Sequence, residues 1–441
     1  MTPKHRAIVP AGVGAYAMGS LANGVFSTVP TILLLYFCTE IMRVPAAWAG
    51  LAVFIPKAWG VVWDPFVGTW SDRTRSRFGR RRPFMMIGAI GVPIAFAALF
   101  WAPVTGATAR FAWVAASYFA LAGFYSLFAV PYSAVPAEIS ADPAVRARLV
   151  GWRMTASMIG VLVGAAVAPV LVEHFGGGRA GYAAMGGCIA AGCFVAMIPP
   201  IAMLADHDAA ARPSAAGERR PRLIDQLRLA FADRGFRWLA ITFLLQLTAV
   251  GAVSATVPYL VVGTWGRAEG EVGAAMGALL VATILSAPVW SWLGRRRGDR
   301  AMLMLAAVGY AGAAIALGLA ALLHSSWPTA VFCFAVAGIP FAGIQVLPFT
   351  IAAHIAHAQS AIRRAEGSAG VEGAFTGVWT SIEKLGLALG PAFAALVLSA
   401  TGRGAAAIAG FVAVVPPALA LLSIGALSIR GRAGSRLEPA I

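Results

Sequence analysis

The chain has 441 residues, of which 59% are hydrophobic and only 12% are charged, whereas soluble globular proteins carry about 25% charged residues. The formal net charge is +16, but the basic residues fall in short gaps between apolar stretches and form no soluble basic face for nucleic acid. The composition therefore excludes a soluble domain and a nucleic-acid partner, and it predicts a multi-pass protein in a lipid bilayer.

Twelve apolar stretches are long enough to cross a bilayer, which takes about 20 residues in a helix. We therefore predict an all-α membrane protein with twelve transmembrane helices. The predicted spans lie near residues 11–38, 44–70, 84–103, 110–137, 149–172, 179–204, 236–263, 269–293, 301–323, 327–354, 372–400 and 403–429. The first stretch has no small-residue cleavage site, so we interpret it as a span and not as a secretory signal.

The distribution of basic residues predicts the orientation. If both termini are cytoplasmic, the inner tails and loops hold 25 Lys and Arg residues and the outer loops hold five. Because positively charged loops stay on the cytoplasmic side, this alternation predicts a multi-pass protein of the cell inner membrane with both termini in the cytoplasm.

The longest inner segment, residues 205–235, divides the chain into two halves of six spans, 1–204 and 236–441. Its first part is rich in Ala, Pro, Ser and Gly and is expected to be flexible. The string RLIDQLRLAFADR predicts a short amphipathic helix on the inner membrane surface. The string DPFVGTWSDRTRSRFGRRRPF of the first half resembles APVWSWLGRRRGDR of the second. Such a weak repeat is typical of two-bundle transporters with a midplane site.

Ionisable residues lie inside the second predicted span. Lys57, Gly60 and Asp64 are spaced three and four residues apart, so they share one helix face. A carboxylate in apolar surroundings is costly unless it is paired, and it usually marks a transport route. Asp64 therefore either marks a transport route or forms a purely structural ion pair with Lys57 or Lys384.

The loop after this span carries six arginines within residues 73–82. We interpret it as a cytoplasmic gate and topology anchor and not as a substrate site. We expect Asp72 to pair with a neighbouring arginine or to cap a helix. The candidate gate residues are Gly68, Asp72, Arg73, Gly79, Arg80, Arg81 and Arg82.

Several strings in the chain resemble one known family. The string WDPFVGTWSDRTRSRFGRRRPF begins inside span 2. The other strings are GSLANGVF and LLLYFCTE in span 1, VPYSAVPAEIS in span 4, GWRMTAS in span 5 and GVWTSIEKLGLALGPA in span 11. Together they resemble the glycoside–pentoside–hexuronide:cation symporters, the melibiose permease group of the major facilitator superfamily. The resemblance implies two six-helix bundles and alternating-access transport of a sugar or glycoside. It also implies a monomer without a cofactor.

The acidic residues of the family are mostly missing. In melibiose permeases span 2 supplies two acids four residues apart; Asp64 matches the second, but Gly60 stands at the first. Ala129 stands where span 4 carries an acid, and Ser20 stands where many relatives carry one in span 1. The end of span 10 reads AAHIAHA in place of an acidic A-D-x-x-D-Y pattern. Because these acids serve the coupling cation in the family, their absence affects which cation this chain is expected to couple.

The basic residues of the family are present. By the resemblance, Lys384 matches a span 11 lysine near the cation site, and Arg153 matches a sugar-contacting arginine of span 5. Sodium needs several oxygen ligands, whereas one carboxylate beside a lysine is sufficient for a proton. We therefore predict proton coupling, or uncoupled transport, ahead of sodium coupling at Asp64.

Lysine is rare in this chain. There are three lysines and 31 arginines, and Lys57 and Lys384 lie inside predicted spans. Flexible, titratable ammonium groups at these positions indicate a role that guanidinium cannot fill. Glu383 points about 100° away from Lys384 on a helix, and it is either a second proton carrier or a partner for another face.

The candidates for substrate contact are polar or aromatic side chains within the predicted spans, and Gln246 and Gln345 are at midplane depth. Aromatic rings form platforms for sugars, although in membrane spans they serve packing more often. The candidates are Arg153, Ser20, Asn23, Tyr125, Tyr132, Trp379, Gln246 and Gln345. The four cysteines have no metal-ligand spacing. His354 and His357 are three residues apart and resemble metal ligands or a proton relay, but two histidines alone seldom bind a metal, so we expect no metal site.

Three hypotheses follow. The first is a secondary transporter of a sugar, glycoside or related small solute, as the resemblance implies. The second is a transporter of the same fold for a lipid-like amphiphile, because the vertebrate lysolipid carriers are related and acidic pocket residues are scarce. The third is a membrane assembly factor that does not transport. An enzyme is not expected, because no nucleophile–base or metal constellation is visible in the sequence.

Overall fold

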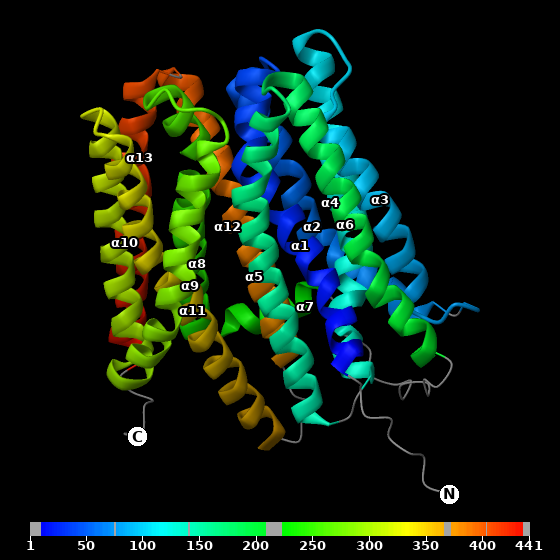
Figure 1. The fold of residues 1–441 in the computed structure, drawn as a ribbon. Helices are drawn as coiled ribbons and strands as arrows, with labels where there is room; N and C mark the ends of the chain where they lie inside the picture. The colour runs from blue at the N-terminus through cyan, green and yellow to red at the C-terminus, as the bar shows by residue number, and fades with distance from the viewer. Residues whose placement is uncertain are drawn as a thin grey trace, which may run out of the picture. The chain divides into compact units, whose positions relative to one another are not determined.

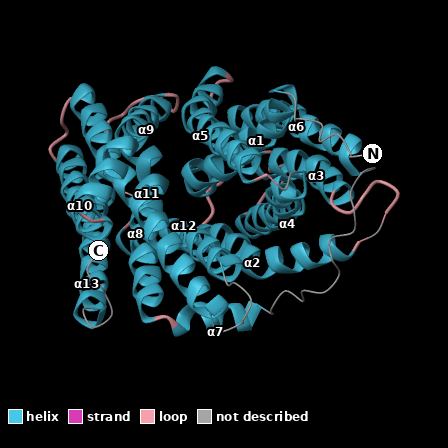
Figure 2. Cartoon of the chain, turned by 90° about the horizontal axis from the view of Figure 1, so that it is seen from below, coloured by secondary structure: helices cyan, strands magenta, loops and turns pink. Residues whose placement is uncertain are grey.

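The computed structural model describes residues 10–74, 76–139, 142–208, 223–365, 372–402 and 404–434, and all regular structure in these ranges is helical (Figures 1 and 2). The elements are α1 (Pro10–Tyr36), η1 (Phe37–Ile41), α2 (Ala46–Arg73), α3 (Arg82–Phe100), α4 (Ala107–Ile139), α5 (Pro143–His174), α6 (Gly178–Asp208), α7 (Leu223–Ala232), α8 (Arg234–Pro258), η2 (Tyr259–Thr264), α9 (Glu271–Arg297), α10 (Asp299–Leu322), α11 (Trp327–Ala365), α12 (Glu372–Thr401) and α13 (Ala405–Gly434).

Twelve helices of the described part are long and apolar enough to cross a membrane. They coincide with the twelve predicted spans, so the all-helical, twelve-span prediction is confirmed. The short helix α7 lies where the sequence predicted an amphipathic helix. Residues 209–222, for which we predicted a flexible segment, lie outside the described residues.

The chain divides into two compact units, Met1–Pro30 with Val62–Glu218 and Thr31–Val61 with Arg219–Ile441. In the first unit α3 packs against α4 and α6, and α5 contacts both of those helices. In the second unit α8 packs against α12 and α13, α10 packs against α11 and α13, and α9 packs against α11.

Residues 31–61 belong to the second unit although they precede the predicted boundary at 205–235. Close contacts explain this assignment. A Cβ atom on Gly50 would lie 2.7 Å from the Cβ of Ala395 in α12. The rings of Tyr36 and Tyr259 meet edge to face, with centroids 5.0 Å apart. The boundaries 1–204, 205–235 and 236–441 remain a prediction.

Glycines allow the first spanning helix of each half to pack closely against the fifth, α1 against α5 and α8 against α12. A Cβ on Gly160 of α5 would overlap the carbonyl oxygen of Leu21 in α1, and one on Gly24 would overlap α5 in turn. A Cβ on Gly390 of α12 would likewise overlap the backbone of α8 at residues 251–252. Small residues of this kind let membrane helices approach closely.

The helices α1 and α8 end in the same irregular turn. In η1 the amides of Met42 and Val44 donate to carbonyl oxygens five and six residues earlier. In η2 the amides of Trp265 and Arg267 do the same. Each turn closes on a residue with positive φ, Arg43 (55°) and Gly266 (60°). Such π-helical turns are rare and often lie at functional sites.

Candidate functional site

Asp64 of α2 is bound to α4. The hydroxyl of Ser126 lies 2.5 Å from one carboxylate oxygen of Asp64 and 3.1 Å from the carbonyl oxygen of Ala122. Ser126 is buried and Asp64 is half-buried. The indole of Trp63 donates to the carbonyl of Gly123 on the same helix pair, at 3.3 Å. The α2–α4 contact therefore holds the carboxylate beside a group that can donate or accept a hydrogen bond.

Lys57 has a neutral partner. Its ammonium donates to the hydroxyl of Thr31 in α1 at 2.8 Å. Whether Lys57 also pairs with Asp64 remains a prediction.

Lys384 of α12 approaches α2 at Gly60. Its ammonium nitrogen lies 4.0 Å from the position that a Cβ on Gly60 would occupy. Glu383 is half-buried, and it shares a helical face with Gly386 and Gly390, which pack against α8. The role of Glu383, as a second proton carrier or as a partner for another face, remains a prediction.

Ser20, Tyr132 and Arg153 belong to one polar cluster of the first unit. The hydroxyls of Ser20 and Tyr132 lie 2.9 Å apart, and Tyr132 also donates to the carbonyl of Tyr16 at 2.5 Å. The rings of Tyr16 and Tyr132 stack at 4.7 Å. The guanidinium of Arg153 interacts with the Tyr16 hydroxyl. This cluster joins α1, α4 and α5, and the sequence did not indicate Tyr16.

The remaining contact candidates differ in their surroundings. Trp379 is buried and stacks on Phe243 at 4.4 Å. Gln246 is buried and donates to the hydroxyl of Ser423 at 3.2 Å. Both lie inside the helix packing of the second unit. Three other candidates are half-buried: Asn23, Tyr125 and Gln345. Their substrate contacts remain predictions.

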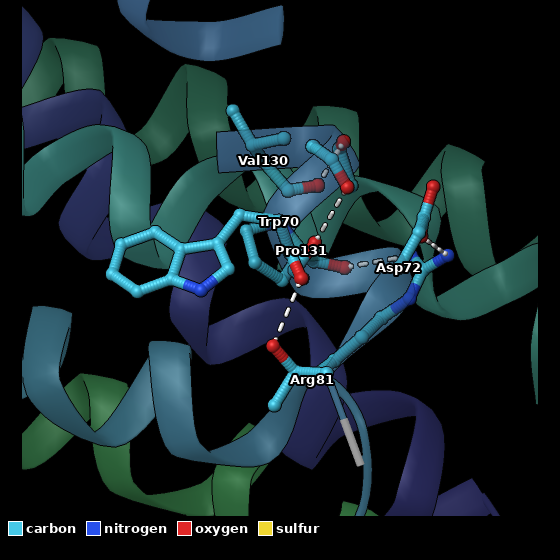
Figure 3. Close-up of polar contacts among 9 residues, drawn as sticks. Trp70, Asp72, Arg81, Val130 and Pro131 are labelled. Atoms are coloured by element: carbon cyan, nitrogen blue, oxygen red, sulfur yellow. Dashed lines mark hydrogen bonds and ion pairs between the residues drawn. The ribbon is translucent and has the colours of Figure 1, made fainter. Parts of the chain in front are cut away.

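The arginine-rich loop is bound inside the first unit through Arg81 (Figure 3). Its guanidinium lies 3.3 Å from the carboxylate of Asp72 at the end of α2 and 3.2 Å from the carbonyl of Pro131 in α4. Gly79 precedes it with φ of 87°, a conformation that favours glycine. Arg73 is exposed, and Gly68 accepts a hydrogen bond from Ser71.

The pairing expected for Asp72 is therefore present, and Arg81 is its partner. Arg80 and Arg82 are half-buried. The sequence could not choose among the six arginines, because only the packing of α3 on α4 brings one of them to Pro131. A gating role for this loop remains a prediction.

A contact between Tyr36, Thr39 and Tyr259 was not predicted. The hydroxyls of Thr39 and Tyr259 lie 2.5 Å apart, and all three side chains are buried. Tyr36 and Tyr259 occupy equivalent places in the two repeated turns, one residue before the first carbonyl acceptor of each. The repeat between the halves was the only signal that could have linked them.

One histidine of α11 lies near a carboxylate. His354 lies 3.8 Å from the carboxylate of Asp299 and is exposed. Within the described ranges, no group of three or more His, Cys, Asp or Glu side chains is placed to hold a metal ion.

Curated relatives align with parts of the chain. It is 33% identical over 163 residues to the glycoside/cation symporter YagG of Escherichia coli strain K12, which is 37% of this chain and 35% of that protein. It is 24% identical over 302 residues to the sphingosine-1-phosphate transporter MFSD2B of Mus musculus, which is 65% of this chain and 61% of that protein. It is also 28% identical over 162 residues to the inner membrane symporter YicJ of Escherichia coli strain K12, 37% of this chain and 35% of that one. The alignments thus span about a third of the two bacterial relatives.

Solved structures share the fold. A bacterial homolog of the human lysosomal transporter Spinster, in an inward-facing and occupied conformation, matches with a TM-score of 0.70 at 15% identity, over 97% of this chain and 98% of that one. A bacterial homologue of the human drug peptide transporters PepT1 and PepT2 matches with a TM-score of 0.68 at 12% identity, over 97% and 98% of the two chains. At these identities the matches show the major facilitator fold alone.

The family comparison covers most of the chain. The profile of the family described as MFS/sugar transport protein matches residues 15–427. This match agrees with the strings in spans 1, 2, 4, 5 and 11 that carried the resemblance, and members of the family are transporters rather than enzymes. The chain therefore belongs to the MFS/sugar transport protein family, the sugar/cation symporter branch of the major facilitator superfamily.

Proposed function

We propose that this protein is a proton-coupled secondary transporter that moves a sugar, glycoside or related small solute by alternating access. It lies in the cell inner membrane with both termini cytoplasmic, and it works as a monomer. The observation that carries the proposal is the hydrogen bond between Asp64 and Ser126 inside a membrane-spanning helix pair. Family membership supports the class of activity.

The Asp64–Ser126 pair favours a proton over sodium. A serine hydroxyl donates to a charged carboxylate and can turn to accept from a neutral one, so it accommodates both protonation states of Asp64. The second hydrogen bond of Ser126, to Ala122, gives its hydroxyl an alternative acceptor when Asp64 is protonated. Sodium requires several oxygen ligands, and Gly60 and Ala129 offer no side-chain oxygen where relatives supply acids.

Lys384 is the second member of the coupling machinery in this proposal, and Glu383 is a further candidate carrier. An ammonium group favours the charged form of a carboxylate with which it pairs until a proton competes. When the proton arrives, the ammonium is released for other interactions. In this proposal, the face of α2 that carries Lys57, Gly60 and Asp64 is part of the proton pathway.

The test is uptake into proteoliposomes. A thermal-stability screen of the purified protein against glycosides, pentosides, uronides and lysolipids identifies a solute first, because a ligand of the folded state raises stability. We then expect uptake to follow an inward proton gradient and to stop with a protonophore. Asp64→Asn and Lys384→Ala should each abolish accumulation, while Glu271→Gln, which alters a carboxylate beside Arg267 at the start of α9, should not.

Sodium-dependent uptake that ignores a protonophore would overturn proton coupling. Intact biological function of both variants, with dependence on a protein partner, would favour the assembly-factor hypothesis. A lipid-like amphiphile is the second candidate solute. It is favoured by the length of the alignment with the mouse sphingosine-1-phosphate transporter, and a stability shift with lysolipids alone would select it.

A further inference from the structure

The hydroxyl of Tyr16 closes a gap in the backbone hydrogen bonds of α4. Pro136 lies inside this helix and has no amide proton, so the carbonyl of Tyr132, four residues earlier, lacks its helical donor. The Tyr16 hydroxyl of α1 donates to this carbonyl at 3.2 Å. In return, the hydroxyl of Tyr132 donates to the carbonyl of Tyr16 at 2.5 Å. The two tyrosines therefore fix each other across the contact between α1 and α4.

Packing holds both rings in place. The rings of Tyr16 and Tyr132 stack with centroids 4.7 Å apart, and the Tyr132 ring also stacks on Phe128 at 5.4 Å. A Cβ on Gly19 would lie 3.0 Å from the Tyr132 ring, so the backbone of α1 lies directly against that ring. Both tyrosines are buried. The positions of their hydroxyl groups are therefore set by the surrounding helices.

The single proton of each hydroxyl decides the direction of the remaining bonds, because a tyrosine hydroxyl donates once and can still accept. The Tyr132 proton goes to the Tyr16 carbonyl, so the Ser20 hydroxyl, 2.9 Å away, is the donor in the bond between Ser20 and Tyr132. The Tyr16 proton goes to the Tyr132 carbonyl, so the Tyr16 oxygen is left as an acceptor. Its partner is the guanidinium of Arg153 on α5, a group that only donates.

Arg153 is the most accessible member of this cluster. It is half-buried, whereas Tyr16, Ser20 and Tyr132 are each 3% exposed or less. A guanidinium carries five N–H donors, so the bond to Tyr16 leaves donors for another ligand. All four residues belong to the first compact unit. A solute on the exposed side can therefore reach Arg153, but the three other side chains lie behind it.

We infer that Tyr16 is a positioning residue that orients the Arg153 guanidinium toward the hydroxyl groups of the transported solute. Ser20 and Tyr132 act through Tyr16, in place of the direct solute contact predicted from the sequence. The inference rests on the proposed transport function, because the ligand of Arg153 is the cargo. A free arginine side chain has many rotamers, and a bond that holds it before the solute arrives reduces the entropy lost on binding.

The first measurement needs no solute. The wild type, Tyr16→Phe, Arg153→Leu and the double variant form a double-mutant cycle in melting temperature. Tyr16→Phe keeps the stacked ring and removes the hydroxyl. The two substitutions should lower the melting temperature by less together than the sum of their separate effects, because both remove the same contact. Additive shifts would show that the hydroxyl and the guanidinium are independent, and they overturn the inference at this step.

The second measurement separates positioning from a purely structural role. Thermal shifts with methyl glucoside, methyl galactoside, methyl xyloside, methyl glucuronide and lysophosphatidylcholine select as probe the compound that binds the wild type best. We expect Tyr16→Phe to raise the Kd of this probe about fivefold and Arg153→Leu to raise it about thirtyfold. Tyr16→Phe should cause no further loss in the Arg153→Leu protein. A structural role would lower the melting temperature and leave the Kd unchanged.

Two further variants complete the design. Tyr118→Phe alters a buried tyrosine of α4 that has no described hydrogen bond, and it should keep the wild-type Kd. Ser20→Ala leaves both bonds of Tyr16 in place and serves if Tyr16→Phe does not fold. It should raise the Kd about twofold, and only while Arg153 is present. A loss that persists in the Arg153→Leu protein would show that Ser20 touches the solute itself, and it overturns the inference.

The outcomes also separate this inference from the proposed function. If Tyr16→Phe binds the probe like the wild type while Arg153→Leu loses binding, positioning is wrong and the proposed function stands. If Tyr16 and Arg153 are coupled in the Kd while Asp64→Asn still accumulates solute, positioning stands and proton coupling through Asp64 is wrong. If none of the five compounds shifts the wild type, the proposed solute class and the positioning role both fail.

Discussion

The hydroxyl oxygens of Tyr259 and Thr39 lie 2.5 Å apart, although 220 positions separate the two residues in the chain. Both side chains are buried, and the ring of Tyr36 packs edge-on against Tyr259. The bond joins the turn after α1 to the turn after α8. Both turns have the same backbone hydrogen-bond pattern. The bond between Thr39 and Tyr259 therefore connects two equivalent turns, η1 and η2.

Tyr259→Phe should lower the stability of the protein by about 1 kcal/mol, because it removes one buried hydrogen bond and keeps the ring contact. Thermal unfolding in detergent measures the effect. Tyr118→Phe is the matched control, since Tyr118 is also buried but has no described hydrogen bond. Equal melting temperatures for the two variants would show that the Thr39 bond contributes nothing.

Ser126→Ala should reduce proton-driven uptake about tenfold, because Asp64 loses a hydrogen bond to a charged group. Ser126→Thr keeps the hydroxyl and should restore most of the rate. Uptake at several pH values separates an effect on proton binding from a general loss of folded protein. Ser71→Ala, which removes a buried hydroxyl bonded within its own helix, should leave uptake unchanged.

Arg81→Ala should destabilise the protein by about 2 kcal/mol, since it removes a charge-assisted bond to Asp72 and a bond to the Pro131 carbonyl. Arg81→Lys should not restore stability, because a single ammonium does not reproduce the two-acceptor geometry of guanidinium. Arg77→Ala should have little effect, because Arg77 is exposed and its described contact is the ring of its neighbour Phe78. Similar losses for Arg77→Ala and Arg81→Ala would contradict this assignment.

Two glycines of α5 should respond oppositely to the same substitution. Gly160→Ala forces a methyl group into the Leu21 carbonyl of α1 and should destabilise the protein. Gly151→Ala meets no atom within 4 Å and should stabilise the helix by about 1 kcal/mol. Melting temperatures that move in the same direction would show that the α1–α5 crossing tolerates a wider separation.

The spans were predictable because membrane insertion acts on length and apolarity, which one sequence displays. The coarse architecture therefore followed from hydropathy, and the family followed from strings such as WDPFVGTWSDRTRSRFGRRRPF. The irregular turns η1 and η2 were not predictable, because their backbone bonds depend on packing that involves Tyr36 and Tyr259.

The contacts of individual side chains were harder to predict from the sequence than the transmembrane spans. Ser126 was not among the predicted site residues, because hydropathy cannot tell which residue of α4 faces Asp64. Trp379 was predicted as a candidate for substrate contact, but its stacking on Phe243 inside the second unit could not be predicted from the sequence. The rotation of each helix about its own axis decides such contacts, and it is set by many weak packing interactions at once.

Gly60 has an evolutionary consequence. Any glycine codon becomes an aspartate or glutamate codon through a change of its second base. A carboxylate at this position would lie beside the Lys384 ammonium and occupy the space that Gly60 leaves. One mutation would then add an acidic group next to this ammonium, and the charge balance of this part of α2 would change without rebuilding a helix.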